Sequence, residues 1–134
     1  MELVVQTRAA IHLAWLRLRL PGLLATESLD DLLARLTPQV ARAPCSFAGL
    51  ERALDRAESL ADRLPKVPRT CLYRCLARYG VYRRYGFGAV FVMGLSPGGP
   101  DEDGHAWLEL EGRPYREERA SEFLVSFRYP ARIA

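Results

Sequence analysis

Apolar residues recur at helical spacing through the first half of the chain, separated by short polar turns. Residues 2–20 are predicted to form a first helix, which we expect to end at Pro21 and Gly22. Residues 28–36 begin with a serine and an acidic turn, which predict a second, short helix. Ser46 is predicted to cap a third helix. Its buried face is expected to contain these apolar residues: Phe47, Leu50, Leu54, Ala57, Leu60, Ala61 and Leu64.

The pattern changes in the second half of the chain. A fourth helix is predicted to begin at Cys71 and to end near Tyr85, because Gly86 suits a left-handed helix end. Residues 87–95 and 105–111 then have the aromatic and β-branched content of strands.

Turn residues predict how these strands connect. The glycine- and proline-rich segment 96–104 is expected to be an exposed loop. Gly112 and Arg113 are predicted to turn the chain into a hairpin partner over residues 114–118.

Together these elements predict an α+β fold, in which a helical N-terminal half packs on a small antiparallel sheet. We expect residues 1–134 to form a single domain, since a chain of 134 residues buries a sizeable core. Residues 1–64 form its helical subregion, and residues 69–134 contain the cysteine-bearing helix and the strands.

Cys71 and His105 are the candidate catalytic pair. A thiol in the first turn of a helix meets unpaired N–H groups and the positive end of the helix dipole, which favour the thiolate. His105 opens a strand directly after a glycine-rich loop, where its imidazole can face a cleft. By the two-residue period, one face of this strand belongs to the core: Ala106, Leu108 and Leu110. The other face contains His105, Trp107 and Glu109.

Composition and charge exclude several classes of protein. The net charge of +3 is spread over arginines interleaved with acids, and this argues against a nucleic-acid-binding stripe but suits an acidic peptide partner. No apolar run is long enough to span a membrane, and residues 3–20 lack the features of a signal peptide. An odd count of three cysteines argues against a disulfide framework. We therefore expect a cytoplasmic protein with reduced thiols.

Three segments in order resemble the transglutaminase-like leader peptidases of lasso-peptide biosynthesis. They are Cys71-Leu72-Tyr73-Arg74-Cys75-Leu76-Ala77, the strand ending Val92-Met93-Gly94-Leu95, and His105-Ala106-Trp107-Leu108-Glu109 followed by Gly112. The resemblance covers residues 69–118. It implies a papain-like core with a Cys-His-Asp triad, in which Cys71 is the nucleophile and His105 the base. It also implies that the protein removes the leader from a ribosomally made precursor, after a small hydroxylated residue such as threonine.

The third member of the triad departs from the family pattern. An aspartate is expected about twelve residues beyond the histidine, but this chain has Glu117 and Glu118 there and no aspartate after Asp103. A glutamate can orient the imidazole equally well. A tight hairpin at Gly112-Arg113 would place Glu118 beside His105, whereas one extra turn residue or a bulge would place Glu117 there. We predict Glu117, with Glu118 as the alternative.

Cys75 and Cys45 are the other two cysteines of the chain. Cys75 lies one turn after Cys71, where a small buried role is more plausible than a redox partnership. A zinc site would need Cys71, Cys75, His105 and Cys45 to converge, at spacings unlike those of structural zinc. We therefore expect neither a metal nor another cofactor.

Three classes of function remain open. The first is a cysteine endopeptidase that acts on a leader–core junction. The resemblance implies that a separate recognition protein captures the leader, with the macrocyclising synthetase as a further partner. The apolar face of the first helix, or Arg74 and Arg78 on the fourth, are candidate docking surfaces. The second class is a transglutaminase or acyltransferase that uses the same thiol, and the third is a non-catalytic peptide-binding module.

Overall fold

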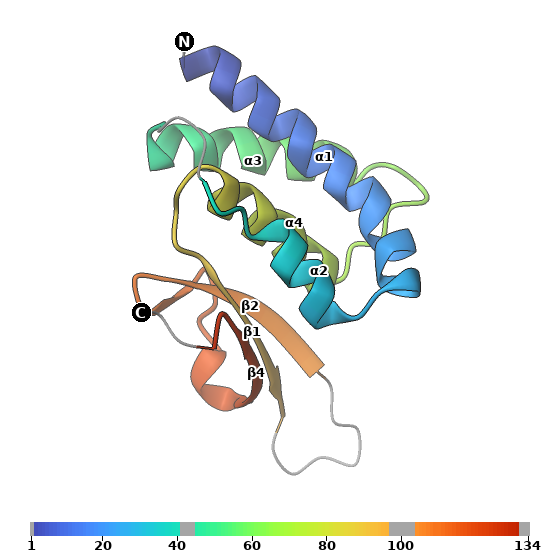
Figure 1. Ribbon diagram of the computed structural model, residues 1–134, viewed down its shortest axis with the longest axis vertical. Helices are drawn as coiled ribbons and strands as arrows, with labels where there is room; N and C mark the ends of the chain where they lie inside the picture. The colour runs from blue at the N-terminus through green and yellow to red at the C-terminus, as the bar shows by residue number, and fades with distance from the viewer. Residues whose placement is uncertain (1, 41–44, 97–103, 132–134) are drawn as a thin grey trace.

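The computed structural model describes residues 2–40, 45–96 and 104–131. Most of the loop predicted at residues 96–104 falls outside these ranges. The helices, labelled in Figure 1, are α1 (Glu2–Thr26), α2 (Leu29–Leu36), α3 (Phe47–Ala61) and α4 (Cys71–Arg84). The strands are β1 (Val90–Leu95), β2 (Gly104–Leu110), β3 (Arg113–Tyr115) and β4 (Leu124–Tyr129), with a 3-10 turn at Ala120–Glu122.

Helix α1 is longer than predicted, because it continues through Pro21 and Gly22 to Thr26. A proline inside a helix removes one backbone hydrogen bond and costs about 3 kcal/mol. The apolar face nevertheless continues across the interruption. Leu20 is fully buried, and Leu23 and Leu24 also pack against the core. This burial explains why the expected helix end at residue 21 was wrong.

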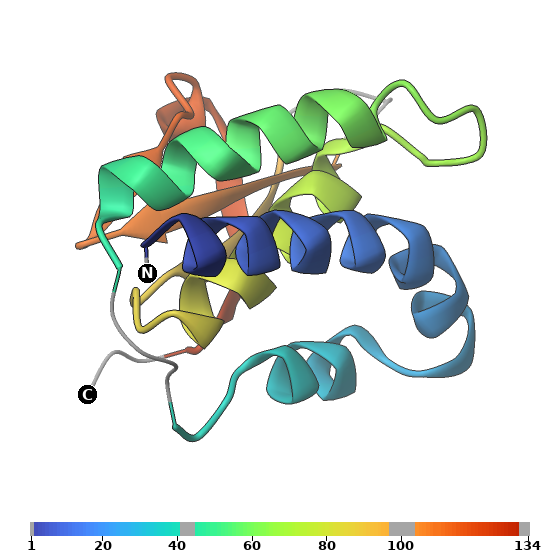
Figure 2. The ribbon, with the colours of Figure 1, turned by 90° about the horizontal axis from the view of Figure 1, so that it is seen from above.

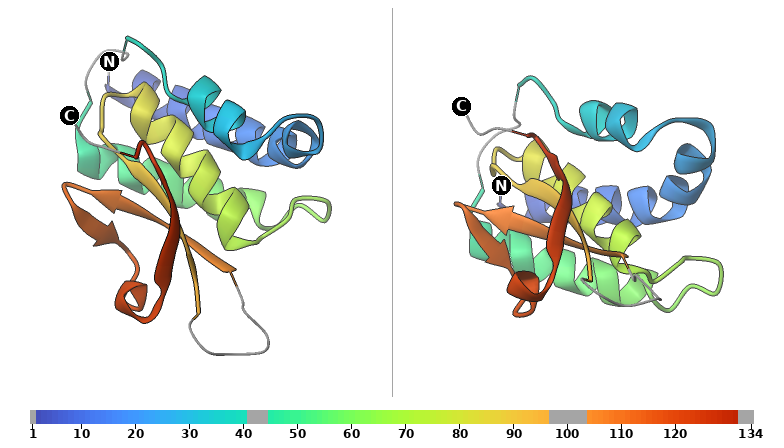
Figure 3. Two further views of the ribbon diagram at one scale, coloured as in Figure 1. Left: turned by 60° about the horizontal axis from the view of Figure 1, so that its bottom comes forward. Right: turned by 90° about the horizontal axis from the view of Figure 1, so that it is seen from below.

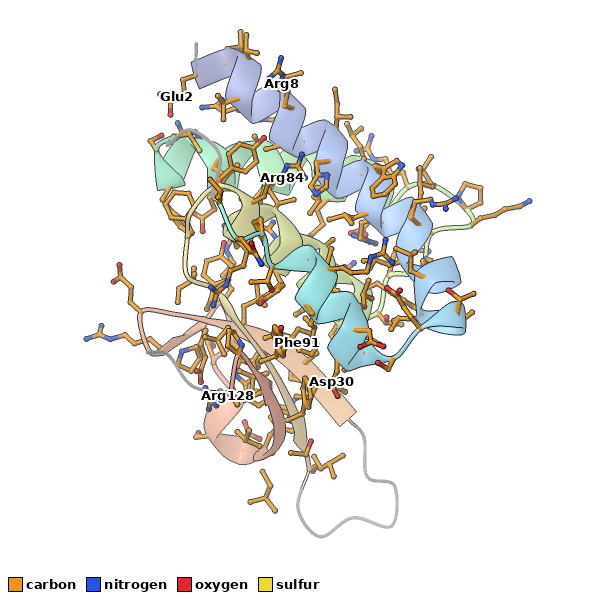
Figure 4. All side chains as sticks on the ribbon, viewed as in Figure 1. Glu2, Arg8, Asp30, Arg84, Phe91 and Arg128 are labelled. Carbon is orange, nitrogen blue, oxygen red and sulfur yellow. The ribbon has the colours of Figure 1, made fainter. Side chains whose placement is uncertain are left out.

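Helices α2 and α3 begin where the capping residues predicted. Ser28 Oγ accepts a hydrogen bond from the Asp31 N–H at 3.2 Å, and Ser46 Oγ accepts one from the Gly49 N–H at 3.1 Å. Ser46 also donates its N–H and O–H to Glu2 Oε1 at 3.0 and 2.6 Å. In Figure 4 the labelled Glu2 lies beside the start of α3. The start of α1 is therefore tied to the start of α3.

The predicted buried face of α3 is only partly buried. Leu50 and Leu54 are in the core, but Leu60 and Leu64 are 63% and 45% exposed. Helical spacing finds the apolar side of a helix and does not show where neighbouring helices stop covering it. The expectation that Leu60 and Leu64 belong to the core was wrong.

The sheet has four antiparallel strands in the order β3-β2-β1-β4. Three of them were predicted, and β4 was missed. In the centre, Gly94 of β1 pairs with His105 of β2. The α+β fold class is thus confirmed.

Helix α4 lies between the sheet on one side and α1 and α2 on the other, as Figures 2 and 3 show. Gly86 ends this helix region with φ +89°, in the left-handed conformation predicted for it. Buried side chains of α4, such as Leu76, Tyr79 and Tyr82, join α1 and α2 to Phe91 of β1 in one core. Phe91, labelled in Figure 4, lies where the sheet meets the helices. The helical half therefore reaches the sheet mainly through α4.

A buried ion pair fixes the segment before α4. Arg17 of α1 is fully buried, and its Nη2 donates to Asp62 Oδ1 at 2.8 Å and to the Pro68 carbonyl at 2.9 Å. Asp62 also accepts from Arg74 Nη2 at 2.8 Å. Both ends of the 62–70 linker are thereby held against the helices. Within the described ranges, no helix is long and apolar enough to cross a membrane.

Candidate active site

The start of α4, strand β2 and the segment after β3 enclose a pocket of about 190 Å³. Cys71, His105 and Glu117, which the sequence selected as catalytic candidates, all line it. Glu118 is exposed and makes no hydrogen bond or ion pair with any other described residue. The pocket thus brings together three residues that are distant in the chain.

Cys71 is the first residue of α4 and is half-buried. Its N-cap residue, Thr70, makes no side-chain capping hydrogen bond. The Thr70 carbonyl accepts only the first helical bond, from the Arg74 N–H at 3.2 Å. Within the described part of the chain, the N–H groups before Arg74 therefore have no side-chain acceptor, and they can bind an anion at the thiol.

His105 and Glu117 form the most direct contact in the pocket. His105 Nε2 lies 2.6 Å from Glu117 Oε2, and both side chains are largely shielded from solvent. The other Glu117 oxygen accepts the Arg119 N–H at 3.2 Å, which fixes the carboxylate from behind. A carboxylate accepts hydrogen bonds only, so the network assigns the proton to Nε2. Nδ1 is then the ring nitrogen left for a reacting group.

The thiol and the imidazole line the same pocket. Among the described residues, Cys71 Sγ makes no hydrogen bond with His105. Catalytic hydrogen bonds are often long in a ligand-free enzyme and shorten in the substrate complex. The arrangement can therefore support nucleophilic chemistry by a thiol, with His105 as base and Glu117 as its orienting group.

The hairpin between β2 and β3 differs from the predicted one by one residue. Leu110 pairs with Arg113, so that the turn consists of Glu111 and Gly112, with φ +53° and +76°. Positive φ at both central residues is typical of a type I′ turn. The expected turn at Gly112-Arg113 was therefore wrong.

Two aromatic rings frame the imidazole. The Phe123 ring stacks on His105 with centroids 4.9 Å apart, and the Trp107 ring lies 5.9 Å away. Trp107 is nearly fully buried against Val90, Val92 and Phe123. Phe123 lies beyond the segment that carries the resemblance, and nothing in its spacing marked it as part of the site.

Gly94 makes room for this aromatic group. A Cβ at this position would lie 2.9 Å from both Trp107 Cη2 and Phe123 Cβ, and 3.1 Å from the Leu124 carbonyl oxygen. Because Gly94 pairs with His105 in the sheet, the lack of a side chain at this position of β1 leaves room for the Trp107 and Phe123 rings beside His105.

Cys75 has a different environment from Cys71. Its Sγ donates a hydrogen bond to the Ala106 carbonyl at 3.4 Å, which joins α4 to β2. Burial, reinforced by the neighbouring Cys71 and Glu58, raises the pKa of Cys75 to about 12. Cys75 therefore stays a neutral thiol. In the described part of the chain, no group of three or more histidine, cysteine or acidic side chains could hold a metal ion.

The two arginines on α4 that were candidates for docking a partner form ion pairs with acids inside the domain. Arg78 is buried, and it donates to Asp55 Oδ1 at 2.5 Å and to Glu58 Oε2 at 3.0 Å. Arg74 is paired with Asp62. Both arginines therefore pair with acids of the α3 region within the domain.

Comparison with known protein families gives a match over most of the chain. A family model described as Transglut_core3, transglutaminase-like superfamily, matches residues 3–128. No curated protein and no solved structure matches the chain significantly. The matched range includes all three candidate residues and all four helices.

Proposed function

Because the chain belongs to the transglutaminase-like superfamily, we propose that it is a cysteine endopeptidase that removes the leader from a ribosomally synthesised lasso-peptide precursor. The observation that carries the proposal is the 2.6 Å contact between His105 Nε2 and Glu117 Oε2, in the pocket that Cys71 also lines. A carboxylate that holds one ring nitrogen leaves the other free to take a proton from a thiol. The choice of a leader peptide as substrate rests on the motif resemblance, and it places the reaction in the cytoplasm, where precursors are made.

In the proposed reaction, the proton of Cys71 Sγ passes to His105 Nδ1 and the sulfur attacks the scissile carbonyl carbon. Glu117 accepts the Nε2–H bond and stabilises the imidazolium. The carbonyl oxygen becomes an oxyanion, which the open N–H groups at the start of α4 can bind. His105 then gives its proton to the leaving amine. A water molecule, deprotonated by His105, attacks the thioester and releases the new carboxylate and the Cys71 thiol.

The test is cleavage of a lasso-peptide precursor, followed by mass spectrometry. Cys71→Ala and His105→Ala are expected to abolish cleavage. Glu117→Gln is expected to lower kcat/KM by about 10²-fold or more, because the amide cannot hold the same tautomer. Each variant has a matched control: Cys75→Ala lies one turn along the same helix, and Glu118→Gln lies one residue away. Both controls should retain most of the activity.

Two outcomes contradict the proposal. If the wild type binds the precursor and leaves it intact, the protein is a peptide-binding module. If the precursor acquires an amine instead of water at the cut carbonyl, the protein is an acyltransferase that uses the same thiol. The product masses separate hydrolysis from amine transfer directly.

Leader capture is proposed to belong to a separate recognition protein, with the macrocyclising synthetase as a further partner. A groove of about 610 Å³ between α1 and α3 is the surface that fits this role. Alanines of both helices line it, while Leu3, Ile11 and Leu60 stand exposed along it. A groove of this form suits one apolar face of a helix.

The charge of the groove selects the kind of helix. Among the described residues, the only charged side chains that line it are Arg56 and Arg63, and neither forms an ion pair within that part of the chain. The proposed occupant is therefore a helix of the recognition protein with acids beside its apolar stripe.

Leu60→Glu tests this surface. It places a negatively charged side chain in the groove, and this charge would repel the acids of the proposed partner helix. We expect the recognition protein's acceleration of cleavage to fall at least about tenfold, with the partner-independent rate unchanged. Leu124→Glu is the matched control, since Leu124 is equally exposed on β4. Unchanged acceleration in Leu60→Glu contradicts the proposal. The proposal is also contradicted if sedimentation velocity shows that the wild type is a dimer and that Leu60→Glu dissociates it. The occupant of the groove would then be a second copy of this chain.

A further inference from the structure

Arg116, the residue directly before the glutamate that contacts His105, has an unusual backbone conformation. The β2–β3 ladder pairs Glu109 with Pro114 and Leu108 with Tyr115. Continued in the same register, this ladder would place Glu118 opposite His105. The chain instead leaves the ladder at Arg116, whose φ is +51°, and Glu117 makes the contact.

The left-handed conformation is unfavourable for any residue with a Cβ, and it persists only where the surroundings hold it. Arg116 is held by its own side chain. Its guanidinium donates to both oxygens of Asp55, with Nη1 2.7 Å from Oδ1 and Nη2 3.1 Å from Oδ2. Nη2 also lies 3.1 Å from Glu51 Oε2. The two acids lie one turn apart on α3, so a rigid helix supplies the whole receptor for the fork.

Asp55 is itself fixed from the side of the cysteine helix. The buried Arg78 of α4 donates to Asp55 Oδ1 at 2.5 Å. Tyr115, next to Arg116, donates to Glu51 Oε2 at 2.5 Å and lies 2.8 Å from the Tyr82 hydroxyl of α4. The acids of α3 thus connect the helix that begins with Cys71 to the segment that ends in Glu117.

We propose that the Asp55–Arg116 ion pair positions the catalytic carboxylate, by holding Arg116 in the left-handed conformation that directs Glu117 to His105. This inference rests on the proposed function for the role of Glu117. Arg116 and Asp55 are positioning residues, because they act through Glu117 and touch neither the nucleophile nor the base.

Two substitutions of Arg116 separate positioning from the loss of an ion pair. Arg116→Ala and Arg116→Gly remove the same positive charge, and both leave the buried Arg78 in place. They differ in backbone preference, because glycine adopts positive φ freely and alanine does not. Arg116→Ala is expected to lower kcat about 5- to 30-fold with KM nearly unchanged, whereas Arg116→Gly should lose less than about threefold. Arg113→Ala, on the same hairpin with ordinary φ, is the control and should match the wild type.

A second readout does not depend on activity. The chain has only two histidines, so ¹⁵N NMR with a His12→Gln spectrum for assignment identifies the His105 ring. The hydrogen-bonded Nε2–H resonance is expected in the wild type and in Arg116→Gly, and it should be lost in Arg116→Ala. Equal spectra and equal kcat for the alanine and glycine variants would overturn the inference. If the resonance follows the expected pattern and no variant cleaves the precursor, the positioning role stands and the peptidase proposal fails.

Discussion

Gly94→Ala tests whether the aromatic frame around His105 depends on the absence of a side chain on β1. The new methyl would lie 2.9 Å from two carbon atoms, about half an ångström inside the range where ordinary van der Waals contact begins. One of these atoms is Phe123 Cβ, which cannot move without its backbone. The Leu124 carbonyl oxygen, 3.1 Å away, is backbone as well. Relief therefore requires β4 and the segment before it to shift.

Overpacking of this kind in a well-packed interior costs about 1–3 kcal/mol. The shift would also displace the Phe123 ring from His105, so peptide cleavage should fall together with stability. Urea denaturation measures the loss of stability, which should appear as a lower midpoint at an unchanged m-value.

Gly104→Ala is the control, because Gly104 belongs to the neighbouring strand and a Cβ there would meet no atom within 4 Å. Its free energy of unfolding should stay within about 0.5 kcal/mol of the wild type. If Gly94→Ala and Gly104→Ala have the same midpoint and the same activity, the close approach at Gly94 has no energetic weight and the reasoning is refuted.

Three further predictions concern other parts of the chain. Iodoacetamide at about pH 8 should label Cys71 and leave Cys75 unmodified in the folded protein, because burial raises the pKa of Cys75 to about 12; equal labelling of the two thiols in mass spectra would contradict this. Gly22→Ala should raise the free energy of unfolding by about 0.5–1 kcal/mol, because Gly22 lies inside α1 with open space around it, and an unchanged melting temperature would argue against it. The hydrogen bond from Arg116, with help from Arg78, lowers the pKa of Asp55 in the folded state, so its stabilisation is complete above the unfolded value of about 4 and disappears as the pH falls through the folded value. Urea midpoints below about pH 4 should therefore decline less in Asp55→Asn than in the wild type, and parallel declines would contradict the assignment.

Local signals in the sequence predicted most of the helices. Two serines whose hydroxyls accept hydrogen bonds from backbone N–H groups mark the starts of α2 and α3, and Gly86 marks the end of α4. Each of these residues acts on backbone groups only a few residues away. The end of α1 was missed for the opposite reason. Pro21 is a local signal for a helix end, but burial of Leu20 and its neighbours against distant elements outweighs it.

The site shows the same division between local and distant causes. The start of α4 at Cys71 and the strand that contains His105 could be predicted from their own residues. The contact of Glu117 with His105 depends on the backbone of Arg116, and that backbone depends on acids of α3 more than fifty residues earlier. No period or motif in the strand segment contains this information. Strand β4 and Phe123 were missed because their burial depends on the sheet they join.

The pairing of α3 acids with arginines of α1, α4 and the β3 hairpin limits how this domain can be divided. A fragment restricted to residues 69–118 would keep every atom proposed to react. It would also leave the buried Arg78 guanidinium without Asp55 and Glu58, and a buried charge stripped of its partners destabilises by several kcal/mol, about 3–5 in measured cases. The segment that carries the motif resemblance is thus smaller than the segment that can be transplanted. Grafting this chemistry onto another scaffold would require the helical half. Otherwise the scaffold would have to supply four carboxylates in place of Glu51, Asp55, Glu58 and Asp62.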